Sequence, residues 1–181
     1  MNKHETRNAQ DLKPETCNMK LSEHFSRSEF TKSSTAIKHC IKNTPPQEAV
    51  DNLKALCQGC LEPLREALGL PVSITSGYRT KALNSMLAHS SERSQHMLGQ
   101  AADFYVAPGQ SGLSRQELLI KAFRLIILDE SIDYDQLILY PSFIHVSYVS
   151  RERNRRTILL GMRNGKLGYG KCSVQNALKI Q

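Results

Sequence analysis

Two residues that can bind a metal ion stand seven positions apart in SERSQHMLGQAADFYV, residues 91–106. They are His96 and Asp103. A loop that runs into a strand over this distance can fold back so that both side chains face one point, and Gly99 would permit the tight turn. A catalytic zinc ion takes three protein ligands, often imidazole and carboxylate, and keeps one position for water. The stretch therefore indicates a metal site that needs a third ligand from elsewhere in the chain.

His145 is the natural candidate for that third ligand. It lies in FIHVSY, residues 143–148, where Phe143, His145 and Ser147 would share one face of a strand. A histidine between apolar residues in a strand is also commonly a hydrogen-bonded core residue. The same alternative applies to His96, and a lone Asp103 could be a cap or turn residue. Spacing alone leaves both interpretations of the three residues open.

The helices and strands that would position these residues can be assigned from the spacing of apolar residues and from the glycines and prolines near the ends of each segment. Apolar residues recur at helical spacing in residues 43–69 and 114–128, and a short helix is expected at 80–87. Strand patterns cover residues 72–74, 101–106, 133–140, 143–148 and 155–163. Pro63 predicts a kink or break near Leu61 in the first long helix. Helices followed by clustered strands predict an α+β fold with a mainly antiparallel sheet.

The chain length fits one domain with short extensions. We expect a flexible polar leader at residues 1–20, a domain at 21–165 and a C-terminal tail at 166–181. The domain would begin at LSEHFSRSEF, with Ser22 and Ser28 as helix caps and Phe25 and Phe30 as apolar anchors.

The five cysteines, at positions 17, 40, 57, 60 and 172, do not form a disulfide framework by number or spacing. Cys57 and Cys60 form a CxxC pair that could be half of a zinc or redox site. Both fall on the leucine stripe of the helix at 43–69, and no second CxxC completes a four-cysteine site. We therefore interpret them as core residues.

The amino-acid composition limits the kinds of binding partner that can be expected. The net charge of +7 favours anionic partners such as nucleic acid, anionic lipid or wall polymers. Tryptophan is absent and no basic helix carries interleaved aromatics, so no nucleic acid partner is expected. RERNRR, residues 151–156, is more typical of a solvated strand edge than of a nucleic acid contact. With no membrane span and no signal peptide, the chain is expected to be cytoplasmic as synthesised.

Three motifs together resemble one known family. The first is S-x-H-x-x-G-x-A-x-D, formed by Ser94, His96, Gly99, Ala101 and Asp103. The others are SGYR at 76–79 and IHVSY at 144–148, in the same order. Over about residues 19–160 the chain resembles the zinc D-Ala-D-Ala carboxypeptidases, a family that includes D-Ala-D-Ala dipeptidases and phage L-alanoyl-D-glutamate endolysins.

This resemblance implies the hedgehog/DD-peptidase fold, with zinc held by His96, Asp103 and His145. It implies that Arg79 and Ser94 help to bind the substrate, a peptidoglycan stem peptide, with Arg79 meeting a carboxylate. The reaction would be peptide hydrolysis of the D,D-carboxypeptidase or L,D-endopeptidase type. A chain released by other means, as from a prophage, would act on the bacterial cell wall.

The acid that should take the water's proton is missing from its usual place. In the best-known relatives it stands three residues before the last histidine ligand, where this chain has Ser142; in others it lies near Leu139 and Tyr140. The upstream candidates are Glu130, Asp133 and Asp135. Asp135 is the preferred base, although at the start of the DQLIL strand it could equally be a turn residue. Tyr140 could orient the water or donate to an oxyanion. The alternative function is a non-catalytic zinc-containing module that binds the cell wall.

Overall fold

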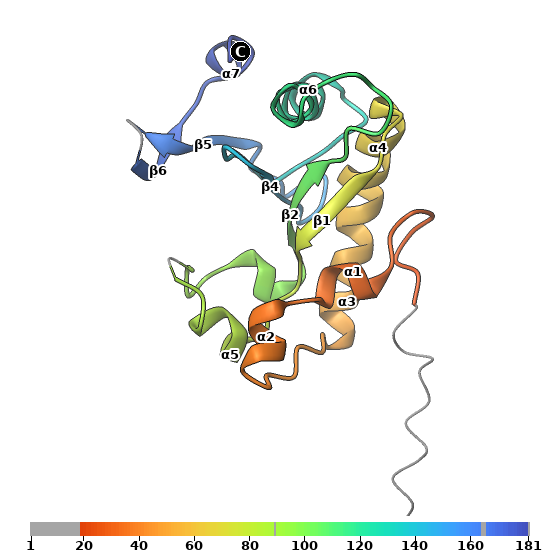
Figure 1. Cartoon of the computed structure of the whole chain (residues 1–181), viewed down its shortest axis with the longest axis vertical. Coiled ribbons are helices and arrows are strands. Elements are labelled where there is room, and N and C mark those ends of the chain that lie inside the picture. Colours follow the sequence, from red (N-terminus) through yellow and green to blue (C-terminus); the bar gives the residue numbers. More distant parts are fainter. Residues whose placement is uncertain (1–18, 89, 164–165, 181) are drawn as a thin grey trace, which may run out of the picture.

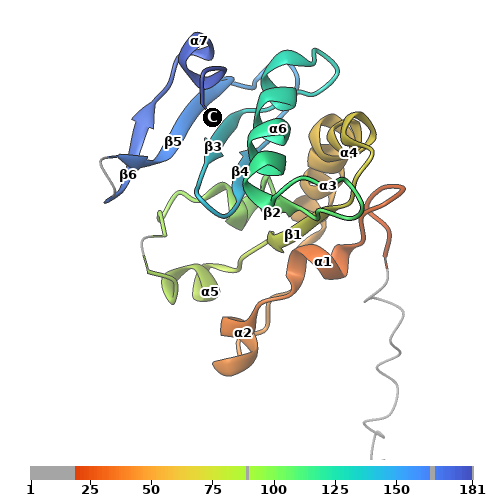
Figure 2. The ribbon, with the colours of Figure 1, turned by 45° about the horizontal axis from the view of Figure 1, so that its top comes forward.

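The fold is built on a six-stranded sheet, seen in Figures 1 and 2. The computed structural model describes residues 19–88, 90–163 and 166–180. The strand order is β1-β2-β4-β3-β5-β6. The strands are β1 (Val72–Ser76), β2 (Ala101–Val106), β3 (Gln136–Leu139), β4 (Ile144–Ser147), β5 (Thr157–Arg163) and β6 (Lys166–Lys171). The predicted α+β class is confirmed.

The sheet is mixed, because β5 runs parallel to β3 while the other neighbouring strands are antiparallel. The β3–β4 hairpin turns at Pro141 and Ser142, as predicted, and Tyr140 N donates to Phe143 O at 3.0 Å. The chain then crosses to the free edge of β3, where Thr157 N donates to Asp135 O at 2.9 Å. This crossover brings residues 149–156 beside the start of β3.

The helices α4 (Glu62–Leu68) and α6 (Arg115–Leu128) lie on one side of the sheet and enclose the core, as Figures 1 and 2 show. The inward residues of β2 and β4 alternate along each strand, which is the period expected when one face is buried. Those residues are Ala102, Phe104, Val106, Ile144 and Val146. Asp103 and His145 occupy the alternate positions, so they lie on the opposite face.

A π-helical segment, η2 (Cys57–Leu61), joins α3 (Gln47–Leu56) to α4 in one continuous helix. Pro63 has no N–H, so it cannot donate to the Gly59 carbonyl one turn earlier. Asp133 N donates to that carbonyl instead, at 2.9 Å. The irregularity predicted near Leu61 is therefore a π segment, and it ties the helix to the chain entering β3.

The two cysteines of this segment, Cys57 and Cys60, are fully buried in the core. Burial raises the pKa of the Cys57 thiol to about 12. Neither thiol is in a disulfide. The interpretation of CxxC as core packing is confirmed.

Short helices form the part that lies below the sheet in Figure 1: α1 (Arg27–Thr31), α2 (Ser34–Lys38) and α5 (Lys81–Ser85). Ser26 caps α1 in a capping box with Glu29, so the expectation of caps at Ser22 and Ser28 was wrong. A reciprocal pair needs Ser or Thr three residues before Glu, and of Ser22, Ser26 and Ser28 only Ser26 has that spacing. Phe25 and Phe30 are buried, as predicted.

The described part of residues 166–181 contributes β6 and a short helix, α7 (Val174–Ala177). Arg124 of α6 donates to the carbonyls of Leu178 and Ile180, which docks this end of the chain on the domain. Of the leader expected at 1–20, residues 1–18 lie outside the described residues. Within the described ranges, we find no helix with the length and apolar character needed to cross a membrane.

Replacing Gly99 by alanine is expected to lower the free energy of unfolding by about 2–5 kcal/mol. Gly99 has a φ of 70°, and an added Cβ would lie 2.3 Å from the carbonyl oxygen of Ala49 on α3. The matched control is Gly69→Ala, since Gly69 has a φ of 63° with nothing near its Cβ position. Urea unfolding measures both, and equal losses would show that the contact with α3 is unimportant.

Candidate metal centre

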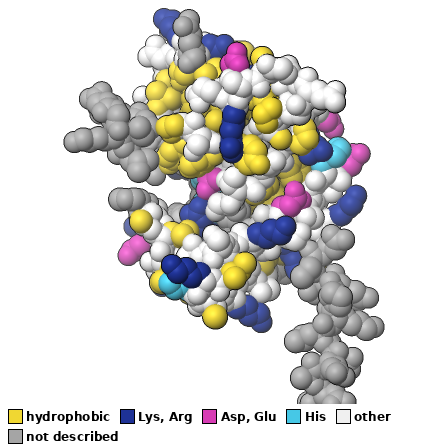
Figure 3. All heavy atoms as spheres, viewed as in Figure 1, with side chains coloured by type: hydrophobic (Ala, Val, Ile, Leu, Met, Phe, Trp, Pro, Cys, Tyr) yellow, Lys and Arg dark blue, Asp and Glu magenta, His cyan; other side chains and the backbone are white. Residues whose placement is uncertain are grey.

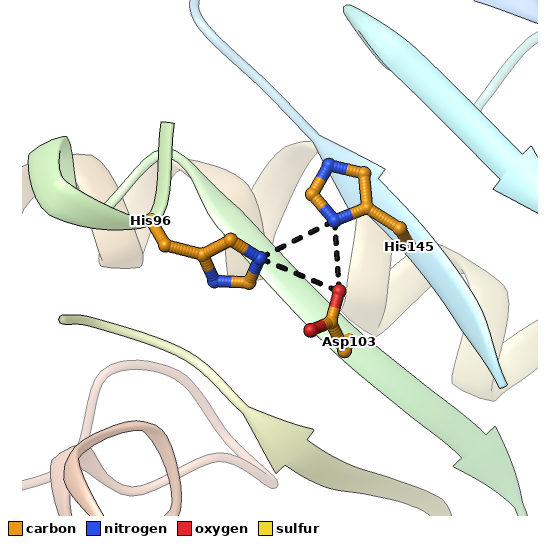
Figure 4. Close-up of side chains that lie close together, drawn as sticks. All are labelled: His96, Asp103 and His145. Atoms are coloured by element: carbon orange, nitrogen blue, oxygen red, sulfur yellow. Dashed lines mark hydrogen bonds and ion pairs between the residues drawn. The ribbon is translucent and has the colours of Figure 1, made fainter. Parts of the chain in front are cut away.

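Two side chains seven residues apart, those of His96 and Asp103, converge with the distant His145 on one point in Figure 4. The His145 Nδ1 atom lies 2.8 Å from Asp103 Oδ1 and 3.3 Å from His96 Nε2. His96 Nε2 lies 3.4 Å from Asp103 Oδ1. One atom from each residue therefore faces a shared centre.

This triangle has the size that a zinc site requires. Zinc–nitrogen bonds of about 2.0–2.1 Å at tetrahedral angles place donor atoms about 3.3–3.4 Å apart. Two of the three separations match that spacing, and the third, at 2.8 Å, is shorter by about half an ångström. Two imidazoles and a carboxylate are a known donor set for catalytic zinc. The residues present therefore fit the metal.

The register of β2 and β4 sets the relative positions of Asp103 and His145. The two are paired across β2 and β4, so their side chains stand next to each other on the face away from the core. His96 reaches the same point from the 3₁₀ turn η3 (Gln95–Leu98), which precedes β2. Gly99 ends this turn in the left-handed conformation, as its position between the two ligands predicts.

The SGYR motif orients the first histidine. The His96 Nδ1 atom lies 2.7 Å from the carbonyl oxygen of Gly77. A carbonyl only accepts, so Nδ1 carries the proton and Nε2 offers its lone pair to the centre. Burial lowers the pKa of His96, which keeps the ring neutral as a metal ligand must be. Glycine is needed at position 77 because an added Cβ would lie 2.6 Å from Phe30.

The SGYR arginine holds the carboxylate ligand. Arg79 Nη2 donates to Asp103 Oδ2 at 3.0 Å, and Arg79 Nε and Nη2 donate to Ser76 Oγ. Burial alone would raise the pKa of Asp103, but the neighbouring histidines outweigh it and hold that pKa below its usual range. Asp103 is thus kept ionised, with Oδ1 turned toward the histidines and Oδ2 toward Arg79.

Asn43 supports this motif from a position to which sequence reasoning gave no role. Its side chain donates to the Tyr78 and Thr31 carbonyls and accepts from Thr80 N at 2.9 Å. One amide thus fixes the backbone on both sides of Arg79. A single asparagine 36 residues upstream carries no local pattern that would predict this contact.

Asp135 is fully engaged in hydrogen bonds. Its carboxylate accepts from Arg155 N at 2.9 Å, from Arg155 Nε at 2.8 Å and from Gln95 Nε2 at 2.9 Å. The side chain is 1% exposed. Desolvation raises its pKa, but the hydrogen bonds from Arg155 and Gln95 prevail and lower that pKa to about 2. These contacts favour a structural role for Asp135 over that of a base.

The other upstream acids make contacts elsewhere. Asp133 accepts from Tyr134 N and from Asn154 Nδ2, and its backbone N–H binds Gly59 of the helix. Glu130 is exposed, and its carbonyl accepts from Arg151. Neither belongs to the group of potential metal ligands among the described residues.

Ser94 and Tyr140, the remaining predicted site residues, lie in different local settings. Ser94 precedes η3 as its N-cap, and its side chain makes no capping hydrogen bond. The Tyr140 ring stacks on Phe143 at 4.4 Å and rests over Gly161, where a Cβ would lie within contact of the ring. Burial lowers the pKa of Arg79, and the charges of Asp103 and Tyr140 act in the opposite direction. The Tyr140 phenol therefore lies within electrostatic range of Arg79.

The Asp135 contacts predict a pH dependence of stability. The folded pKa of about 2 lies below the ordinary value of 3.8, so the stabilisation is present above about pH 4 and lost as the pH falls through 2. Since Arg155 is largely exposed, the expected contribution is on the order of 1–2 kcal/mol. Urea unfolding between pH 5 and 2 should show a steeper loss for the parent than for Arg155→Ala. An equal change of the unfolding free energy with pH in the two proteins would contradict the role of Arg155 in lowering the pKa of Asp135.

The comparison with protein families agrees with this geometry. Residues 23–147, more than half of the chain, match the family model described as Peptidase M15. A search of curated proteins found no match. The matched span includes SGYR, His96, Asp103 and His145. The resemblance seen in the three motifs is thereby confirmed: the chain belongs to the M15 peptidases, the zinc D-Ala-D-Ala carboxypeptidase family.

Proposed function

We propose that this protein is a zinc metallopeptidase that hydrolyses peptide bonds in the stem peptides of peptidoglycan. The observation that carries the proposal is the convergence of His96, Asp103 and His145 in a chain of a zinc-dependent peptidase family. The three ligand atoms lie on the face of the sheet away from the core, and the His145 side chain is 13% exposed. A substrate can therefore approach the centre from that face.

Bound zinc would polarise the scissile carbonyl and bring the pKa of its water toward about 7. The protein's own contribution is to fix the ligands before the metal arrives. The Gly77 carbonyl sets the His96 tautomer, and Arg79 sets the orientation of Asp103. Such supporting contacts normally change metal affinity or activity by about 10–100-fold when removed.

Substrate binding is assigned to Arg79 and Ser94. Arg79 uses Nε and Nη2 for Ser76 and Asp103, so Nη1 is the part of the guanidinium that those two contacts leave for a substrate carboxylate or carbonyl. Arginine is suited to both tasks because its planar group carries several fixed donors. Ser94, beside His96 in η3, offers a hydroxyl that is not used as a helix cap.

Tyr140 is proposed as a hydrogen-bond donor to the oxyanion, a role that does not replace the missing proton acceptor; a zinc-bound water with a pKa of about 7 would lose its proton to bulk solvent. It stands at the end of β3, close to where relatives carry a glutamate, and its ring is fixed by Phe143 and Gly161. A phenol held in this way can donate a hydrogen bond to the oxyanion that develops during hydrolysis. Asp135, the base expected from the sequence, is not proposed as the base, because its carboxylate already accepts hydrogen bonds from Arg155 and Gln95.

The proposal is tested by incubating purified protein with defined muropeptides, with zinc and after removal of metal by a chelator. We expect cleavage that stops on chelation and returns on adding zinc. Mass spectrometry of the products separates the two variants of the proposal: loss of a terminal D-alanine indicates a D,D-carboxypeptidase, and a cut after L-alanine indicates an L,D-endopeptidase. Zinc-loaded protein that leaves every muropeptide intact would refute the proposed activity.

A second candidate is a zinc-containing module that binds the wall without cutting it. Ser142, exposed in the β3–β4 turn, is the observation that favours it, because the acid of the best-known relatives is absent there. Retention of zinc-loaded protein on intact sacculi without release of peptide would support this candidate. Nucleic acid binding has less support, because the lysines and arginines on the face shown in Figure 3 are scattered among acidic and apolar side chains.

A further inference from the structure

We infer that Asp135 is a positioning residue that locks the segments carrying two of the three metal ligands to each other. Its carboxylate joins Gln95, next to His96, to Ser147, two residues beyond His145. Arg155 holds the carboxylate from the third side. This inference rests on the proposed zinc site and adds three residues, Gln95, Asp135 and Arg155, that lie outside the ligand set.

Gln95 connects the Asp135 carboxylate to the segment that carries His96, the first candidate ligand. Gln95 Nε2 donates to Asp135 Oδ2 at 2.9 Å, and Arg155 Nη2 donates to Gln95 Oε1 at 3.4 Å. Gln95 opens the 3₁₀ turn, so its side chain sets where that turn sits against the sheet. A four-residue turn has little stability of its own, and its position must come from tertiary contacts.

Ser147 connects Asp135 to the strand that carries His145, the last candidate ligand. Asp135 N donates to Ser147 O at 2.7 Å, and Ser147 Oγ lies 3.4 Å from Asp135 Oδ2. Ser147 Oγ also accepts from Gln136 N at 3.1 Å. Ser147 is fully buried and shares its strand face with His145. The same carboxylate therefore reaches both ligand-bearing segments.

Arg155 explains why a buried acid can serve in this place. A buried carboxylate is costly unless it is paired and hydrogen-bonded. Arg155 supplies its backbone N–H, Nε and Nη2, from the crossover that brings residues 149–156 beside β3. Holding η3 and β4 at a fixed separation keeps His96 Nε2 and His145 Nδ1 at the spacing that zinc needs.

The test replaces Gln95 by glutamate, which sets a second negative charge against Asp135 and pushes the turn away. Zinc affinity, measured by competition with a chromophoric chelator, is expected to fall on the order of tenfold. The visible absorption of the cobalt-substituted protein should change as well. Gln100→Glu is the matched control: it adds the same charge in the same segment, at a side chain that none of the contacts above uses, and should leave both readings unchanged.

The second variant pair tests the coupling itself. Asp135→Asn alone should also weaken zinc binding, since it removes the charge that holds Arg155. The double variant with Gln95→Glu again has one carboxylate and one amide, now with the carboxylate at position 95 beside Arg155, so it should bind zinc more tightly than either single variant. A double variant whose loss equals the product of the two single losses would overturn the inference. A Gln95→Glu protein with the same zinc affinity and the same cobalt absorption as Gln100→Glu would also overturn the inference.

Circular dichroism of the metal-free proteins separates positioning from folding, because the inference requires the Gln95→Glu chain to keep the parent's spectrum. The readout is metal binding and not hydrolysis. A parent protein that binds zinc but cuts no muropeptide would therefore refute the proposed function alone. Intact cleavage with unchanged zinc affinity in Gln95→Glu would refute this inference alone.

Discussion

Replacing His145 by alanine is expected to abolish chelator-sensitive hydrolysis and to weaken zinc binding severely. The change removes one of three ligands, and the two that remain cannot hold the metal at a catalytic geometry. Because zinc supplies several kcal/mol of stabilisation to the reaction, the rate should fall on the order of 10³-fold or more. Steady-state hydrolysis of a muropeptide and zinc competition titration measure the two effects.

His39→Ala is the matched control for this variant. His39 is exposed at the end of α2 and belongs to no group of potential ligands among the described residues. It should leave both zinc affinity and rate unchanged. An alanine variant of His145 that still binds zinc as tightly as the parent would show that the metal lies elsewhere.

Replacing Tyr140 by phenylalanine is expected to lower kcat by about 10²–10³-fold while zinc affinity stays the same. The ring can keep its stacking on Phe143 and its place over Gly161, so the change removes only the hydroxyl. Loss of one donor to a developing oxyanion has an effect of this size in other hydrolases. Single-turnover hydrolysis with zinc-loaded protein isolates the chemical step.

The comparison variant is Tyr148→Phe, which removes a phenol that packs against Gly59 of the helix. It is expected to hydrolyse at the parent rate. A Tyr140→Phe protein with unchanged kcat would exclude the phenol from the reaction and would direct attention back to the upstream acids. Reduced zinc affinity in that variant would assign Tyr140 to the metal site and not to the chemical step.

The metal centre was predictable because two of its ligands are close in the sequence and the third lies in a strand, where alternate side chains face the same side. His96 and Asp103 are linked by one turn whose glycine has a left-handed conformation, and His145 lies in a strand whose alternate residues are buried. The family resemblance added that these segments meet. β2 spans the predicted residues 101–106, whereas β3 and β4 are shorter than the strands predicted at 133–140 and 143–148.

The surrounding contacts were not predictable, because they join residues far apart in the chain. Asn43 meets the SGYR segment, and Gln95 meets Asp135 and Arg155, through pairings that depend on the crossover after β4. Nothing in the pattern of residues 149–163 indicates that β5 runs parallel to β3. Asp135 was considered as a base because sequence shows an acid near a strand and does not show its partners.

The most direct test of the metal centre is a crystal structure of the zinc-loaded protein with anomalous data at the zinc edge. We expect one strong peak about 2.0–2.2 Å from His96 Nε2, Asp103 Oδ1 and His145 Nδ1, with a fourth position open to water or substrate. A peak at Cys57 and Cys60, or a site closed by four protein ligands, would contradict this expectation.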